Sequence, residues 1–202
     1  AWWPWRKMAA VRLCLPQGIS MPSTESCGEM PADAVVVCAD EQAVAGFATR
    51  LAAALPPRAM LAIEGDLGAG KTTFVKHLAA AIGVDPSGVT SPTFTLAHLH
   101  EVPPAEGAAG DESARSDHAS PTRLVHIDAY RLSGLDDLAT IGWEEFVAGE
   151  GWLAVEWPER VAAALPADRL TIRIEITGRD SRTLHLQATS PALRQAAQAA
   201  AA

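Results

Sequence analysis

The sequence predicts an α/β fold, a three-layer sandwich in which helices cover both faces of a mostly parallel sheet, with an antiparallel hairpin at its C-terminal end. Over most of the 202 residues, short apolar runs alternate with segments of helical periodicity, which is typical of parallel strands joined by helices. Near the end, Leu170–Ile176 and Thr183–Thr189 alternate polar and apolar residues around Gly178-Arg179-Asp180, which indicates the hairpin. Hydrophobic residues make up 49% of the chain, enough for a domain of this length to bury a core.

The first half of the domain contains two strands, each followed by a helix. The apolar run Ala34–Cys38 is the first expected strand, and Asp40 is a suitable N-cap for the helix after it. Apolar residues then recur every three or four positions until Pro56-Pro57 ends the helix. The run Ala59–Glu64 is expected to be a buried strand. A glycine-rich loop follows, and then a second helix that Gly83 closes as its C-terminal cap.

The second half continues the same alternation. Phe94–Val102 begins with strand-like alternation, and Arg123–Asp128 is the next apolar strand. Leu135–Val147 is expected to form one or two short helices, and Trp152–Glu156 another buried strand. The C-terminal hairpin then completes the sheet.

Three segments differ from this pattern. Residues 1–32 precede the first regular element and are expected to be a poorly ordered extension. Residues 103–122 contain no large apolar residue and are rich in Pro, Gly, Ala, Ser and charge, so they cannot bury enough surface to offset their ordering entropy. We expect them to be a disordered insertion in a domain that spans residues 33–189. Residues 190–202 form an alanine-rich tail, expected to be a frayed helix or disordered.

Composition excludes several classes of protein. The net charge of -8 disfavours binding to DNA or direct non-specific binding to RNA, because an acidic chain repels phosphate backbones. No apolar run reaches the roughly 18 residues that a membrane span requires. The three cysteines form no CxxC pair, which favours reduced thiols in a cytoplasmic protein. His98 and His100 alternate along a strand without a third ligand nearby, so a zinc site is not expected.

The strongest motif is Gly65–Thr72, which matches the P-loop pattern G-x-x-x-x-G-K-[ST] and lies between a buried strand and an amphipathic helix. Glycines let such a loop wrap its backbone N–H groups around phosphate oxygens, and the helix N-terminus faces the same anion. The fold is therefore expected to be of the P-loop NTPase type, with ATP as the ligand. The expected nucleotide-binding residues of the loop are Asp66, Leu67, Gly68, Ala69, Gly70, Lys71, Thr72 and Thr73.

Within the loop, Lys71 is expected to reach the β- and γ-phosphates and the hydroxyl of Thr72 to bind Mg²⁺. A P-loop also needs an acidic partner for the metal, at the end of a neighbouring strand. Asp128 and Glu156 both follow apolar strands and are expected to point into the same crevice. The residues alone do not decide which of the two is the metal ligand.

Two further residues are candidates because of their place in the chain. Thr93 and its neighbours form a Ser-Pro-Thr turn after the P-loop helix, which could present a hydroxyl or a backbone carbonyl to the γ-phosphate and metal, although an ordinary turn is an equal alternative. Trp157 follows Glu156, and its indole could pack beside the nucleotide or simply belong to the core.

Several nucleotide-binding classes lack support. The chain has no Asn-Lys-x-Asp sequence for guanine selection, which disfavours a GTPase. It has neither an H-R-D nor a D-F-G sequence, which excludes a protein kinase.

Four motifs in one order resemble the bacterial TsaE family, the ATPase of tRNA threonylcarbamoyladenosine biosynthesis. They are Gly65–Thr73 (GDLGAGKTT), Ser91–Leu96 (SPTFTL), His126–Leu132 (HIDAYRL) and Val155–Glu159 (VEWPE). The resemblance covers roughly residues 34–189. It implies a P-loop ATPase that is weak alone and works with the partner proteins TsaB and TsaD, which modify adenosine 37 of tRNA. ATP hydrolysis would reset that complex between cycles. The acidic charge of the chain favours an indirect contact with tRNA.

The resemblance also implies roles for individual residues. Lys71 would contact phosphate and act in catalysis. Thr72 and Glu156 would together hold Mg²⁺, and Asp128 would be the Walker-B-type aspartate needed for hydrolysis. Thr93 would lie in the switch-like loop. The tryptophan that the family has beside its site would be Trp157.

Two alternative functions keep the P-loop and change its role. A small-molecule kinase would transfer the phosphoryl group to a metabolite, and it would usually carry an arginine-bearing lid, of which no compact segment is visible here. A nucleotide-responsive binding module would use ATP only to control docking, with negligible turnover.

Overall fold

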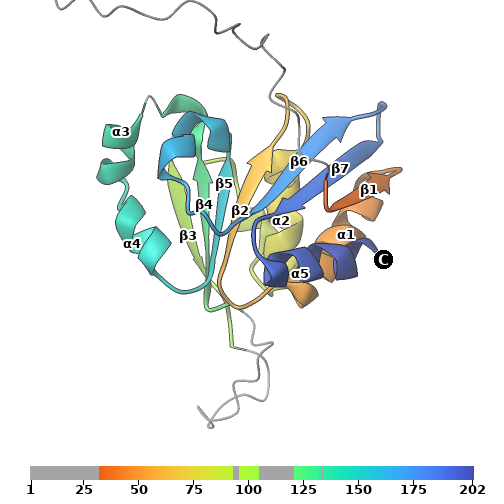
Figure 1. Cartoon of the computed structure of the whole chain (residues 1–202), viewed down its shortest axis with the longest axis horizontal. Helices are drawn as coiled ribbons and strands as arrows, with labels where there is room; N and C mark the ends of the chain where they lie inside the picture. The colour runs from red at the N-terminus through yellow and green to blue at the C-terminus, as the bar shows by residue number, and fades with distance from the viewer. Residues whose placement is uncertain (1–31, 93–95, 105–120, 133) are drawn as a thin grey trace, which may run out of the picture. The chain divides into compact units, whose positions relative to one another are not determined.

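The computed structural model describes residues 32–92, 96–104, 121–132 and 134–202. The expected extension at residues 1–32 and the expected insertion at residues 103–122 therefore lie almost entirely outside the described residues, as does Thr93. Within the described residues, seven strands form one sheet in the order β1-β7-β6-β2-β5-β4-β3 (Figure 1). They are β1 (Ala34–Cys38), β2 (Ala59–Glu64), β3 (Ala97–Glu101), β4 (Arg123–Asp128), β5 (Trp152–Glu156), β6 (Leu170–Ile176) and β7 (Arg182–Ala188).

The middle of the sheet is parallel and its two margins are antiparallel. Strands β6, β2, β5 and β4 run in one direction, whereas β3 pairs antiparallel with β4 and β7 with β6. The predicted hairpin of β6 and β7 is confirmed by the pairing of Leu170 with Ala188 and Ile176 with Arg182. The first strand, β1, adds to the far side of this hairpin by pairing antiparallel with β7.

Helices cover both faces of the sheet, as the sequence predicts. On one face lie α1 (Glu41–Ala54), α2 (Lys71–Ala81) and α5 (Pro191–Ala201), and on the other α3 (Leu135–Thr140) and α4 (Trp143–Ala148) (Figure 1). Alternate residues of β2 enter two separate apolar clusters, with Leu61 facing α1 and α2 and Met60 facing the other layer. Three short 3₁₀ segments complete the described elements: η1 (Pro86–Gly88), η3 (Ala129–Arg131) and η4 (Pro158–Ala164).

Local signals fixed the ends of the first two helices. The side chain of Asp40 accepts a hydrogen bond from the N–H of Ala43 at 2.8 Å, as expected for the N-cap of α1. Helix α2 ends at Ala81, and Gly83 has a φ of 83°, the left-handed conformation of a C-terminal cap.

The alanine-rich tail forms a helix, one of the two expected forms, but it packs on the domain instead of fraying. Ser190 caps α5 by accepting a hydrogen bond from the N–H of Leu193, and Arg50 of α1 donates from Nε to the carbonyl of Ala200 at 2.8 Å. Alanine has the highest helix propensity, and its small side chain lets two helices approach closely. The buried face follows a helical spacing through Leu193, Ala196, Ala197 and Ala200.

No helix among the described residues is both long and apolar enough to cross a membrane.

The topology of the sheet makes β2, β5 and β4 adjacent and parallel, which determines where the site lies. The residues that follow these strands therefore emerge at one edge of the sheet.

Candidate functional site

The loop of residues 65–70 joins β2 to α2 at this edge, in a conformation that requires glycine. Gly65 has a φ of 141°, and a Cβ added there would lie 2.5 Å from the carbonyl oxygen of Ile174 in β6. Gly70, immediately before α2, has a φ of 102°. The loop thus passes closely over β6 and then turns sharply into the N-terminus of α2, which is the backbone geometry of an anion-binding loop.

Lys71, the first residue of α2, is held inside the site. Its side chain is only 5% exposed, and Nζ donates hydrogen bonds to the carbonyls of Gly65 at 2.7 Å and Asp66 at 2.9 Å. Burial lowers the pKa of Lys71, while the surrounding carboxylates, with Glu156 the strongest, act in the opposite direction. The ammonium group is therefore a buried cation at the start of a helix, where an anion would be stabilised.

Trp157 forms one wall beside this ammonium group. Lys71 Nζ lies 3.6 Å from the centroid of the indole, a cation–π contact, and the ring of Tyr130 is 5.0 Å away on a tilted plane. Trp157 has a φ of 56°, a left-handed conformation that costs about 1–3 kcal/mol in a non-glycine residue. Such strain is typical of functional sites, and here it accompanies the placement of the indole against Lys71.

A hydrogen bond links Glu156, at the end of β5, directly to helix α2. Its carboxylate is almost fully buried and accepts two hydrogen bonds on the same oxygen, Oε1. One comes from the hydroxyl of Thr72 and the other from Nε2 of His126, each at 2.8 Å. A threonine hydroxyl that donates its hydrogen to a carboxylate keeps its oxygen lone pairs for a cation.

Asp128, at the end of β4, lies opposite Glu156 in the register of the two strands. It is 5% exposed and accepts hydrogen bonds from the Ser91 hydroxyl at 2.9 Å and from the N–H of Tyr130 at 3.0 Å. The two carboxylates are therefore neighbours with different donors: Glu156 is linked to α2, and Asp128 to the segment that leads from α2 to β3.

The oxygen donors fit a magnesium ion better than a transition metal. Two carboxylates and the Thr72 hydroxyl are hard ligands, and Mg²⁺ is usually held by one or two carboxylates together with waters and substrate phosphates. Among the described residues, no group of three or more His, Cys, Asp and Glu side chains forms a metal cage.

The structure brings together most of the residues singled out in the sequence, namely Lys71, Thr72, Asp128, Glu156 and Trp157. Ser91, which contacts Asp128, belongs to the Ser-Pro-Thr turn that the sequence singled out, whereas sequence reasoning missed His126, which contacts Glu156. His126 precedes Asp128 by two positions on a strand, so the alternation of β4 already placed both on the same face. It also missed Arg182 of β7, whose Nε donates to the carbonyl of Ala69 in the loop at 2.9 Å.

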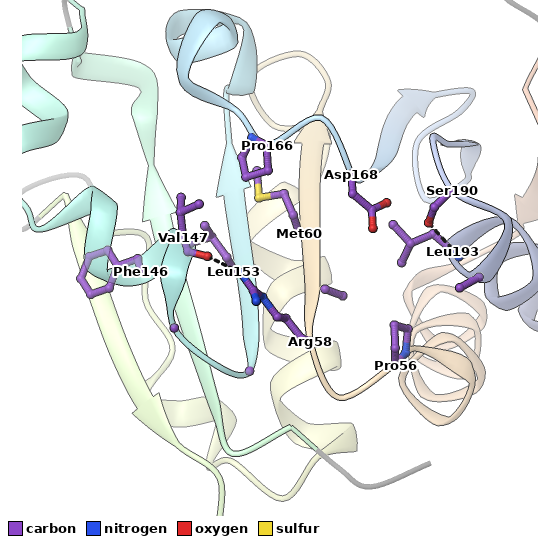
Figure 2. A pocket seen from close by; sticks show the side chains of 14 residues that line it. Pro56, Arg58, Met60, Phe146, Val147, Leu153, Pro166, Asp168, Ser190 and Leu193 are labelled. Carbon is purple, nitrogen blue, oxygen red and sulfur yellow. Dashed lines mark hydrogen bonds between the residues drawn. The ribbon is translucent and has the colours of Figure 1, made fainter. Parts of the chain in front are cut away.

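A hollow lies at the opposite ends of the strands. It has a volume of about 300 Å³ and lies near the start of β2 and β5, where Met60 and Leu153 form part of its wall (Figure 2). Arg58 at its rim donates to the carbonyl of Val147 at 2.7 Å. None of the loop residues or carboxylates described above lines it, so the two sites are separate.

Comparison with known proteins identifies the family to which this arrangement belongs. A family model described as "Threonylcarbamoyl adenosine biosynthesis protein TsaE" matches residues 38–184. The chain belongs to the TsaE family. The matched range contains the loop, both carboxylates and the described strands from β2 to β6, and it ends in β7 before α5.

Individual members of the TsaE family support the assignment. A Treponema pallidum protein named "tRNA threonylcarbamoyladenosine biosynthesis protein TsaE" is 35% identical over 143 residues, 71% of this chain and 92% of that protein. An Aquifex aeolicus protein of the same name is 36% identical over 152 residues, 75% of this chain and 93% of that protein. The crystal structure of Bacillus subtilis YdiB has a TM-score of 0.59 and 26% identity, covering 82% of this chain and 92% of that one. The resemblance inferred from the four motifs is thus confirmed.

Proposed function

We propose that this TsaE-family chain is the Mg²⁺-dependent ATPase subunit of the assembly that forms N6-threonylcarbamoyladenosine at position 37 of tRNA. The observation that carries the proposal is the convergence of Lys71, Thr72, Asp128 and Glu156 at one edge of the sheet, around a loop with the backbone of a phosphate cradle. Hydrolysis of ATP would reset the assembly between rounds of modification.

The loop and the start of α2 would bind the triphosphate. Backbone N–H groups of residues 66–73 would surround its oxygens, and Lys71 would exchange its two carbonyl contacts for the β- and γ-phosphates. Thr73 would add a side-chain hydroxyl. Trp157 would remain beside the ammonium group and shield it from water, which strengthens its interaction with phosphate.

Glu156 and Asp128 would have different roles, the first in binding the metal and the second in orienting water. Glu156 and the Thr72 hydroxyl would hold Mg²⁺, which when bound neutralises charge on the phosphate oxygens. Asp128 would orient the attacking water by accepting its hydrogen bond. The Ser91 hydroxyl donates to Asp128, which supports a role for the turn that Ser91 begins as a switch that would respond to the γ-phosphate. The reaction is accelerated by positioning and by stabilisation of the charge that develops on the transferred group.

The biological role would depend on partners. TsaB and TsaD are the proposed partner proteins, the carbamoyl-transfer chemistry would belong to them, and contact of this acidic chain with tRNA would be indirect. The setting would be the cytoplasm, without a membrane or DNA partner.

The decisive experiment measures ATP turnover of the purified chain with Mg²⁺, alone and then with TsaB, TsaD and substrate tRNA. We expect slow turnover alone and faster turnover in the mixture, with Asp128→Asn retaining ATP binding but losing multiple rounds of tRNA modification. Fast turnover alone, or no response to the partners, would overturn the role and return it to the kinase and binding-module alternatives, of which a screen of phosphate acceptors would test the kinase. Full modification by Asp128→Asn would favour the binding module.

A further inference from the structure

We infer that His126 is a positioning residue that orients Glu156 for magnesium binding, an inference that rests on the proposed function. His126 is 0% exposed in the middle of the sheet, on the face that carries Asp128 and Glu156. Its Nε2 lies 2.8 Å from Glu156 Oε1. No other residue of the described strands donates a side-chain hydrogen bond to this carboxylate.

The hydrogen bond fixes the carboxylate between two elements of the fold. Thr72 approaches Oε1 from α2, and His126 approaches the same oxygen from β4. In the register of the sheet, His126 lies opposite Ala154 of β5, whose small side chain leaves space for the imidazole to reach Glu156 two positions further along. Both donors use Oε1, so within the described part of the chain Oε2 has no hydrogen-bond donor and is the oxygen left for a cation.

The chemistry of the ring defines what kind of donor is needed. A carboxylate only accepts hydrogen bonds, so Nε2 must carry the hydrogen. Nδ1 is buried and has no hydrogen-bond partner among the described residues. Within this part of the chain, the hydrogen bond from Nε2 to Glu156 is therefore the only one that the ring makes. A buried side chain with this single contact is a fixed donor to Glu156, in the way that neighbours of metal ligands commonly orient them.

Loss of this donor is expected to affect the metal more than the nucleotide. Glu156 would keep only the Thr72 hydroxyl, and that hydroxyl must also contact the cation, so the carboxylate would no longer be held in one orientation. Replacing such supporting residues typically costs roughly 10- to 100-fold in metal affinity. ATP affinity without Mg²⁺ depends on the loop and Lys71, which His126 does not contact, and should change little.

Three substitutions of His126 in the full chain distinguish the effect of its N–H donor from the effect of its imidazole volume. His126→Leu removes the N–H, His126→Asn offers an amide that is too short to reach Oε1, and His126→Gln places an amide N–H near the position of Nε2. The control is His100→Leu, which removes a half-buried histidine from the neighbouring strand β3 and breaks no hydrogen bond within the described residues.

Calorimetry would measure the affinity for ATP in EDTA and at increasing MgCl₂. We expect His126→Leu and His126→Asn to raise the half-saturating Mg²⁺ concentration roughly 10-fold or more. His126→Gln and His100→Leu should stay within about twofold of the wild type, and affinity in EDTA should be alike in all five proteins. A purely structural role would lower the melting temperature without moving the Mg²⁺ midpoint.

Two failures are distinguishable. If the wild type binds ATP with a normal Mg²⁺ dependence and the Leu and Asn variants share its midpoint, or if Gln is as impaired as Asn, the assignment of His126 is wrong. If the wild type binds no ATP, or binds it without any response to Mg²⁺, the proposed function itself fails. Should His126→Leu not fold, the comparison of the Asn and Gln variants, both amides, decides the question.

Discussion

The close approach of the loop to β6 predicts that Gly65→Ala destabilises the protein through a specific steric conflict. The added Cβ would lie 2.5 Å from the Ile174 carbonyl oxygen, well inside the 3.4 Å of an ordinary contact, and 3.2 Å from the Cβ of Ala69. Ile174 is paired with Leu184 in the β6–β7 hairpin, so its carbonyl cannot retreat freely. The loop would therefore have to move by several tenths of an ångström.

The expected cost combines this conflict with backbone strain. A side chain in a positive-φ conformation costs roughly 1–2 kcal/mol, and displacement of the loop adds a similar amount, so we expect a loss of about 2–4 kcal/mol in the free energy of unfolding. Gly68→Ala is the matched control, because its φ is 80° but a Cβ there meets nothing within 4 Å. It should cost only about 1 kcal/mol.

Urea unfolding of the wild type and both variants measures this difference, with the slope of the transition as a check that the same surface is exposed. Gly65→Ala should also lower ATP affinity in calorimetry, since the displaced backbone carries the N–H groups of the loop. If Gly65→Ala is no less stable than Gly68→Ala, the contact with Ile174 does not constrain the loop and the reasoning fails.

Three further outcomes are expected. Lys71→Ala should weaken ATP binding at least 10-fold, since it removes the cation at the loop, and an unchanged calorimetric affinity would refute the assignment. Leu193→Ala should lower the free energy of unfolding by about 2–4 kcal/mol, because this side chain lies on the buried face of α5. Replacement of the exposed Gln195 by Ala should change the same free energy by less than about 0.5 kcal/mol. Burial, with His126 and His98 nearby, lowers the pKa of His100, so the folded protein binds fewer protons there than the unfolded chain. Stability should thus fall as pH drops below about 6.5, and urea unfolding at several pH values should show a shallower fall in His100→Leu; an identical slope would contradict this.

The parts of the fold that sequence reasoning predicted are those with a local signature. The P-loop, the strands that end in Asp128 and Glu156, and the cap at Asp40 each depend on residues within one short segment. The alternation of polar and apolar residues was enough to predict the C-terminal hairpin, because one face of β6 and β7 is buried and the other is not.

What the sequence did not predict depends on long-range packing or on weak hydrophobic signals. The residues of Ala34–Cys38 do not by themselves predict that this strand pairs with β7, because the two strands lie far apart in the sequence. The packing of α5 was missed because alanines have little apolar surface, so their helical spacing resembles a polar tail. The role of His126 depends on which carboxylate its ring meets, and that is set by the neighbouring strand.

The site and the core are specified by the same strand register. On β4, Leu124 enters the apolar cluster that also contains the buried residues of α1, α2 and α5, and His126 and Asp128 follow on the same face. Val125 and Ile127 enter the opposite cluster. On β5, Ala154 and Glu156 share the first face in the same way. A one-residue slip of β4 would bury its polar residues among the apolar side chains of the second cluster, at a large cost in unfolding free energy. Mutations of the core on these two strands should therefore disturb the Glu156–His126 hydrogen bond even where they touch neither residue, because the register that buries the apolar side chains also sets the distance between the two.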